Sequence, residues 1–207
     1  TTIRYLAKKV NGKKIVSIKK SKKKLRKNLN IKDLNLIKGK KILEVKRFAK
    51  YIIIKISTQS FIVIHLGMSG RLKFYLKDSY KKEKHDHIIL EFEKFFVIYN
   101  DPRRFGMFFK LKDRKELKSF FSNYGLDLLV DKIDVSKIIN KFKNKSVSLK
   151  QALLDQSIFV GLGNENSLLN LLISSKVLIK KLSVAFIIPL KFLFFMILRI
   201  IPTRSSM

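Results

Sequence analysis

The first half of the chain is divided into short runs in which hydrophobic and polar residues alternate. Glycine, lysine or asparagine separates one run from the next. Alternation with a period of two is typical of a strand that buries one face, and strands at such close spacing favour an antiparallel sandwich or barrel. The predicted strands follow a helix at the start of the chain and cover residues 13–19, 42–47, 51–57, 61–65, 71–75, 87–92 and 95–100.

The second half has a helical periodicity. From Lys115 onward, apolar residues recur at the spacing of a helix. Within 148–157 the residues at that spacing are Leu149, Ala152, Leu153 and Gln156. A Gly-Leu-Gly-Asn break at 161–164 precedes a second apolar helical stretch. We therefore predict an α+β chain of two lobes with a cleft between them, an antiparallel β-sandwich lobe at 1–123 and a helical lobe at 124–207.

The net charge predicts a polyanionic partner. The chain carries 46 Lys and Arg against 15 Asp and Glu, a formal net charge of +31, which favours nucleic acid over a membrane surface. Part of this lysine excess is what an A+T-rich genome produces. For the basic run at 21–27, Ser-Lys-Lys-Lys-Leu-Arg-Lys, the first interpretation is a solvated loop and the second is a loop that follows DNA phosphates.

Cysteine is absent, which excludes disulfides, a cysteine nucleophile and thiolate-held zinc or iron–sulfur sites. The three histidines do not have the spacing of a metal site. The most apolar tract, 184–201, contains Pro189, Lys191 and Arg199, so it favours a pair of buried helices over a membrane span. No signal-peptide pattern opens the sequence. These features predict a cytoplasmic protein with no metal, no cofactor and no membrane partner.

Two short phrases carry the most specific chemistry. Residues 65–72 read His-Leu-Gly-Met-Ser-Gly-Arg-Leu, and residues 99–106 read Tyr-Asn-Asp-Pro-Arg-Arg-Phe-Gly. Each places one apolar side chain, Met68 or Phe105, in a glycine-bounded turn beside cationic residues. An apolar wedge next to arginine is suited to entering a base stack while phosphates are neutralised. The alternative for both side chains is ordinary core packing.

The ordered motifs of the chain resemble the formamidopyrimidine-DNA glycosylase family. These bacterial enzymes excise oxidised purines, such as 8-oxoguanine and formamidopyrimidines, and then cut the strand at the abasic site. The resemblance runs from residue 1 to about residue 176. It rests on the two phrases above and on residues 12–15, 50–51, 84–87, 150–156 and 161–164.

The resemblance implies roles for individual residues of the sandwich lobe. Met68, Arg103 and Phe105 would fill the space left by a flipped-out nucleotide, with Arg103 hydrogen-bonded to the orphaned cytosine. Lys50 would be the catalytic lysine that contacts phosphate and assists β-elimination. His85 would contact the DNA backbone, for which a solvated loop histidine is the alternative.

In the helical lobe, the resemblance implies a helix–two-turn–helix hairpin that binds DNA phosphates through Lys145, Lys150 and Asn164. The physical basis is the start of the second helix, where free N–H groups and the helix dipole attract anions. Without the resemblance, the break at 161–164 indicates only the end of a helix.

The resemblance also implies parts of the family pattern that the printed sequence does not contain. In the family, an N-terminal proline attacks the sugar C1′, a glutamate follows it, and a four-cysteine zinc finger lies near the end. This sequence begins at Thr1 and has no cysteine, so we expect a member truncated at both ends.

Three hypotheses follow from these observations. The first is a base-excision DNA glycosylase and abasic-site lyase that acts as a monomer on double-stranded DNA containing oxidised purines or abasic sites. The second is a catalytically inactive relic that still binds damaged or abasic DNA. The third is a general basic nucleic-acid-binding protein.

Overall fold

The computed structural model describes residues 2–127, 131, 140–141, 147 and 149–163. The chain divides into two compact units, Thr1–Asp131 and Lys132–Met207. Among the described residues, the strands all belong to the first unit and helix α5 (Leu149–Leu154) belongs to the second. No helix in the described part of the chain combines the length and the hydropathy needed to cross a bilayer.

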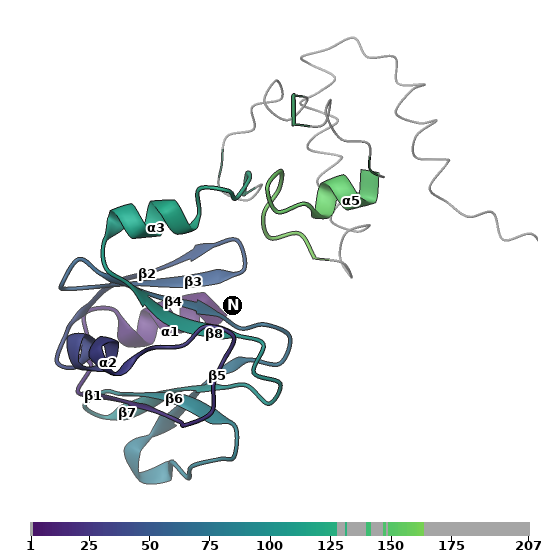
Figure 1. Cartoon of the computed structure of the whole chain (residues 1–207). Helices are drawn as coiled ribbons and strands as arrows, with labels where there is room; N and C mark the ends of the chain where they lie inside the picture. The colour runs from purple at the N-terminus through teal and green to yellow at the C-terminus, as the bar shows by residue number, and fades with distance from the viewer. Residues whose placement is uncertain (1, 128–130, 132–139, 142–146, 148, 164–207) are drawn as a thin grey trace, which may run out of the picture. The chain divides into compact units, whose positions relative to one another are not determined.

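The first unit is a sandwich of two antiparallel sheets, which lie one above the other in Figure 1. This arrangement confirms the predicted antiparallel sandwich. One sheet has the strand order β1-β6-β7-β5 and the other β2-β3-β4-β8. The strands are β1 (Ser17–Lys20), β2 (Ile42–Phe48), β3 (Tyr51–Ile56), β4 (Phe61–His65), β5 (Arg71–Leu76), β6 (Asp86–Glu91), β7 (Phe95–Asn100) and β8 (Met107–Leu111).

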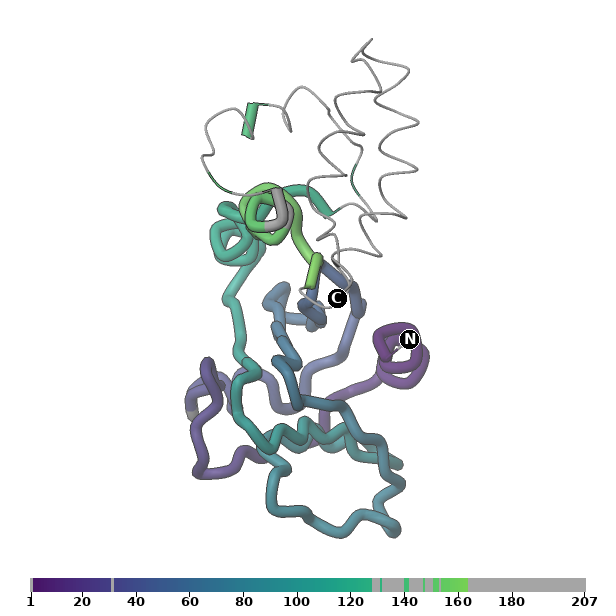
Figure 2. Tube along the Cα trace, turned by 90° about the vertical axis from the view of Figure 1, so that its right-hand side faces the viewer, coloured from purple at the N-terminus to yellow at the C-terminus, as the bar shows by residue number. Residues whose placement is uncertain are grey.

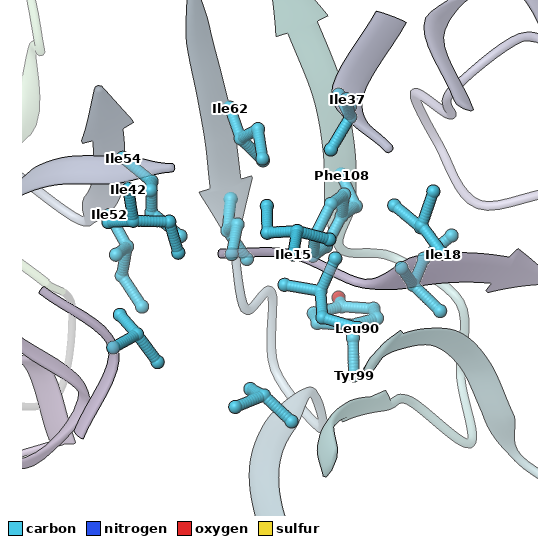
Figure 3. Close-up of a cluster of buried hydrophobic side chains, with 14 of the residues drawn as sticks. Ile15, Ile18, Ile37, Ile42, Ile52, Ile54, Ile62, Leu90, Tyr99 and Phe108 are labelled. Carbon is cyan, nitrogen blue, oxygen red and sulfur yellow. The ribbon is translucent and has the colours of Figure 1, made fainter. Parts of the chain in front are cut away.

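The core between the sheets is built from the inward residues of the alternating runs (Figure 3). Ile15, Ile54, Leu90 and Phe108 are each buried to 2% exposure or less. Helix α1 (Thr2–Val10) adds Leu6 and its neighbours one turn away to the same core, because residues three and four apart share one face of a helix. The alternation in the sequence therefore identifies the residues that hold the sandwich together.

One α-helix and one strand were not predicted from the sequence. Helix α2 (Ile31–Ile37) begins at a capping box, in which Asn30 and Asp33 exchange side-chain to backbone hydrogen bonds. Strand β8 pairs with β4, more than forty positions earlier. The predicted strand at 13–19 begins only at Ser17. Figure 2 shows α1 and the segment that contains α2 on opposite sides of the sheets.

A second apolar cluster covers the outer face of the β2-β3-β4-β8 sheet. Helix α3 (Arg114–Phe120) begins at Asp113, whose carboxylate accepts the amides of Lys115 and Glu116. Phe120, at the end of this helix, packs against Tyr51 and Phe109 of the sheet. The chain after α3 is thereby held against the β2–β3 hairpin.

A 3-10 turn, η1 (Lys77–Ser79), follows β5.

In the second unit, the predicted helix at 148–157 is found over Leu149–Leu154. It ends at Asp155, whose carboxylate accepts the Ser157 amide at 2.8 Å. The helical stretch predicted after residue 164 lies outside the described residues.

Candidate nucleic-acid interface

The two phrases singled out in the sequence form two turns that touch each other. Gly67, in the first turn, has a φ of +66°, and a Cβ built on it would lie 2.9 Å from the amide nitrogen of Gly106. A Cβ on Gly106 would overlap the hydroxyl of Tyr99. The glycines are therefore required by close backbone contact as well as by the left-handed conformation of Gly67.

One buried carboxylate joins the two turns. Asp101 is fully buried and accepts hydrogen bonds from Ser69 Oγ at 2.5 Å, from the Gly106 amide at 2.9 Å and from the Tyr99 hydroxyl at 3.2 Å. Burial alone would raise its pKa, but the hydrogen bonds from Ser69 and from the amides of Gly106 and Arg104 outweigh burial and lower the pKa of Asp101. The carboxylate therefore stays ionised and is hydrogen-bonded to both turns.

The apolar side chains of these turns point away from the core. Met68 is 74% exposed and Phe105 is 51% exposed, which rules out ordinary core packing for both. The guanidinium carbon of Arg103 lies 4.9 Å from the centre of the Phe105 ring, a cation–π distance. The Arg103 amide donates to Ser69 Oγ at 3.1 Å. Two apolar groups and one cation thus project from a rigid base.

The basic run at 21–27 is attached to the second turn by its backbone. The amide of Arg26 donates to the carbonyl oxygens of Arg104 and Gly106 at 3.2 and 3.1 Å. The next carbonyl, that of Lys27, accepts the Phe108 amide at 2.9 Å. These backbone contacts join residues 26 and 27 of the basic run to the second turn, and Lys22, Lys23 and Lys24 of the same run are exposed.

A buried histidine lies behind this junction. His87 is 1% exposed, and its Nδ1 lies 3.0 Å from Ser21 Oγ while its Nε2 lies 2.9 Å from the carbonyl oxygen of Asp101. His87 connects the basic run to the wedge turns, a role that the sequence did not predict. His87 lies at a register shift between Asp86 and Ile88, and the alternating pattern of the sequence does not reveal such an irregularity.

Lys50 lies in the hairpin loop between β2 and β3 and is exposed. Together with Thr2, Arg4 and Leu66 it lines a cleft of about 550 Å³. Burial and then the positive charges of Lys50 and Arg26 lower the pKa of His65, whose Nδ1 accepts the Gly67 amide at 3.1 Å. His65 must be unprotonated at Nδ1 to accept that hydrogen bond. The charge of Lys50 therefore acts on a side chain that supports the first turn.

The comparisons with known proteins agree with this geometry. A family model described as the formamidopyrimidine-DNA glycosylase N-terminal domain matches residues 1–108, which is more than half of the chain. The chain belongs to the formamidopyrimidine-DNA glycosylase family.

Two of the similar curated relatives come from Wolbachia and Rickettsia. A formamidopyrimidine-DNA glycosylase from Wolbachia pipientis subsp. Culex pipiens is 38% identical over 161 residues, which cover 77% of this chain and 59% of the relative. One from Rickettsia bellii is 39% identical over 126 residues, 59% of this chain and 45% of the relative. The chain therefore spans about half to three-fifths of the length of these relatives.

Solved structures of the family have the same fold. The Lactococcus lactis formamidopyrimidine-DNA glycosylase, non-covalently bound to DNA containing an abasic site, matches with a TM-score of 0.71 and 28% identity over 78% of this chain and 62% of that chain. The same enzyme in complex with DNA containing Fapy-dG matches with a TM-score of 0.71 over 79% of this chain and 62% of that chain.

The structure brings together part of the site that the family resemblance predicts. Met68, Arg103 and Phe105 lie on adjoining turns. The carbonyl of His85 accepts the Asp101 amide at 3.1 Å, so His85 lies at the edge of the same turns. In α5 only the backbone of Lys150 is described, and Lys145 and Asn164 lie outside the described residues.

Proposed function

We propose that this chain binds double-stranded DNA at oxidised purines and abasic sites and acts in base-excision repair as a DNA glycosylase and abasic-site lyase. The observation that carries the proposal is the pair of joined turns with Met68, Arg103 and Phe105 exposed on them. Its alternative, an inactive relic that binds damaged DNA, rests on the same turns and differs only in the chemistry.

The turns fit a vacated position in a duplex. Flipping a nucleotide out of the stack costs a few kcal/mol, and this expense is least where the base is already damaged or missing. Met68 and Phe105 supply apolar surface for the empty space, and Arg103 supplies a forked donor for the edge of the unpaired base. Because Asp101 and the glycines fix the turns before DNA arrives, little ordering is left for the moment of binding.

The basic segment at 21–27 supports binding to the DNA backbone. Lys22, Lys23 and Lys24 are exposed in a segment hydrogen-bonded to the second turn. Lysine side chains at this place neutralise phosphates next to the vacated position and make binding depend steeply on salt.

The chemistry we propose is centred on the cleft beside Lys50. In the family pattern described above, the attacking group is the amine of an N-terminal proline, which the printed sequence does not contain. This amine attacks the C1′ aldehyde of an abasic sugar, and loss of water gives an iminium ion. Loss of the C2′ proton then breaks the C3′–O bond and releases the phosphate. Lys50 would hold the phosphate and assist this β-elimination. No redox cofactor takes part in these steps.

The remaining phosphate contacts belong to the second unit. We propose a helix–two-turn–helix hairpin there, with α5 as its first helix and with Lys145, Lys150 and Asn164 directed to the DNA backbone. One pair of wedge turns serves one vacated site, so the proposed binding unit is a monomer.

Borohydride trapping tests the function. The protein encoded by the full open reading frame is incubated with duplexes containing 8-oxoguanine or an abasic site, with an undamaged duplex as control. Covalent bands with both damaged duplexes support the glycosylase and lyase. Salt-sensitive binding to the abasic duplex without any band supports the relic, and equal binding to all three duplexes contradicts both.

A further inference from the structure

We propose that Asp127 is a positioning residue that fixes the loop carrying Lys50. The inference rests on the proposed function, in which Lys50 meets the DNA at the abasic site. Asp127 is separated from the loop by 78 positions in the sequence, and no motif described above includes it.

The loop that presents Lys50 has an unfavourable backbone conformation. Phe48 pairs with Tyr51, so only Ala49 and Lys50 connect the two strands. Ala49 has a φ of +51°, in the left-handed region that residues with a Cβ rarely adopt. Such a conformation persists only where its surroundings hold it.

Asp127 and Arg47 stabilise this conformation through hydrogen bonds to the amide and the carbonyl of Ala49. The amide of Ala49 donates to Asp127 Oδ2 at 3.1 Å, and the carbonyl of Ala49 accepts from an Arg47 guanidinium nitrogen at 2.8 Å. Arg47 and Asp127 also form an ion pair at 2.9 Å. Asp127 is 2% exposed, so water does not compete for its carboxylate and the charge-assisted bonds are strong.

An aromatic cluster keeps Asp127 in place relative to the hairpin. Phe48 and Tyr51, on either side of the loop, contact the rings of Phe121 and Tyr124 edge to face. The hydroxyls of Tyr51 and Tyr124 are 2.8 Å apart. Residues 121–127 therefore pack against β2 and β3, and Asp127 at the end of this segment is hydrogen-bonded to the loop between the same two strands.

These contacts determine the backbone position from which the Lys50 side chain extends at the cleft. Lys50 directly follows Ala49 in the two-residue loop, so the conformation of Ala49 sets the point from which the exposed Lys50 side chain projects. When the clamp is lost, Ala49 relaxes out of the left-handed region and Lys50 leaves with it. A displacement of about 1 Å at a reacting group is enough to slow a reaction roughly 100-fold.

The test compares Asp127→Asn with Glu44→Gln, a variant that removes the same charge from a half-exposed carboxylate on β2 that pairs with Lys46. Single-turnover cleavage of an abasic duplex is measured together with binding to a tetrahydrofuran-containing duplex. We expect D127N to slow cleavage roughly 10- to 100-fold while binding changes little, and E44Q to change neither.

Two further variants separate positioning from a general structural effect. In a Lys50→Gln background, D127N has no further effect on cleavage if Asp127 acts through Lys50. Ala49→Gly restores part of the rate lost in D127N, because glycine adopts the positive φ without a clamp. A loss of equal size in both backgrounds, or no recovery with A49G, overturns the proposal.

Hydrogen exchange makes the inference testable apart from the enzyme activity. The Ala49 amide should exchange at least about tenfold faster in D127N than in E44Q, and unchanged protection overturns the positioning role. If the wild-type protein does not cleave abasic DNA, or K50Q cleaves normally, the proposed function or the role of Lys50 fails, and the exchange measurement still decides whether Asp127 holds the loop.

Discussion

The hydroxyl of Ser69 donates a hydrogen bond to the carboxylate of Asp101 over 2.5 Å, across a partly buried junction between two residues that are thirty-two positions apart in the sequence. The same carboxylate accepts the Gly106 amide. Met68 precedes Ser69 and Phe105 precedes Gly106, so this one acid is hydrogen-bonded to a direct neighbour of each wedge residue. The wedge is therefore as rigid as the buried contacts beneath it.

Replacing Asp101 should reveal its contribution to stability through pH. Because its folded pKa is lowered, its ionised form stabilises the fold above the unfolded pKa of about 3.9, and this stabilisation is lost as pH falls through the folded pKa. We expect Asp101→Asn to lower the free energy of unfolding at pH 7 by about 1–3 kcal/mol. Urea unfolding from pH 7 to pH 2 should show the gap to wild type closing below about pH 4; a gap independent of pH would contradict this account.

Gly67 should be much less tolerant of alanine than Gly12. Both have positive φ, but a Cβ on Gly12 would meet nothing nearer than 4.0 Å, whereas one on Gly67 would lie 2.9 Å from Gly106. The conformation alone costs about 1–2 kcal/mol, which is the expected effect of Gly12→Ala. Gly67→Ala should lower the unfolding free energy further. Equal losses in urea titrations would show that the two turns do not need to touch.

Met68→Ala and Phe105→Ala should separate stability from binding. Since both side chains are largely exposed, each change should alter the unfolding free energy by no more than about 0.5 kcal/mol. Preference for abasic over intact duplex should fall by about 1–3 kcal/mol, the range for a lost stacking contact. Leu76→Ala, which truncates a side chain that is 66% exposed on β5, is the control. A matching effect of L76A on DNA preference would refute the wedge.

Arg103→Ala should act on the unpaired base. We expect discrimination between cytosine and other bases opposite the lesion to drop by about 1–3 kcal/mol. Competitive gel shifts with the four opposite bases measure this directly. If binding weakened equally for all four, Arg103 would be a phosphate contact and its role at the orphaned base would be wrong.

The basic segment should be visible in the salt dependence of binding. Changing Lys22, Lys23 and Lys24 to glutamine should reduce the slope of log K against log salt by about 0.9 for each phosphate contact removed. The matched triple variant at Lys112, Lys115 and Lys118, exposed lysines around α3, removes the same charge elsewhere. If both triple variants changed the slope equally, net charge rather than position would explain the binding.

Much of the fold follows from local pattern. The predicted strands at 42–47, 61–65 and 95–100 agree with β2, β4 and β7 to within one residue at each end, because their alternation directly records which face is buried. The region of β8 received no prediction, since its partner β4 lies far away in the sequence and only the assembled sheet gives it a place. Helix α2 was missed for a different reason: it is short and depends on a capping box.

The candidate site divides in the same way. The wedge residues were found because glycine-bounded turns with an apolar and a cationic residue are visible in a few adjacent letters. No individual role was predicted for His87, Arg26 or Asp127, because single His, Arg and Asp residues carry little information until their partners are known. Their partners lie 66 positions away for His87 and Ser21, and 78 for Asp127 and Ala49.

By itself, the sequence determined the strands other than β8, the two wedge turns and the family, since alternation, turn residues and motif order are properties of neighbouring positions. Only the tertiary structure decided what supports the turns and the Lys50 loop. Those supports are hydrogen bonds to buried groups. The structural role of a buried carboxylate such as Asp101 or Asp127 depends on the donors that the fold brings to it.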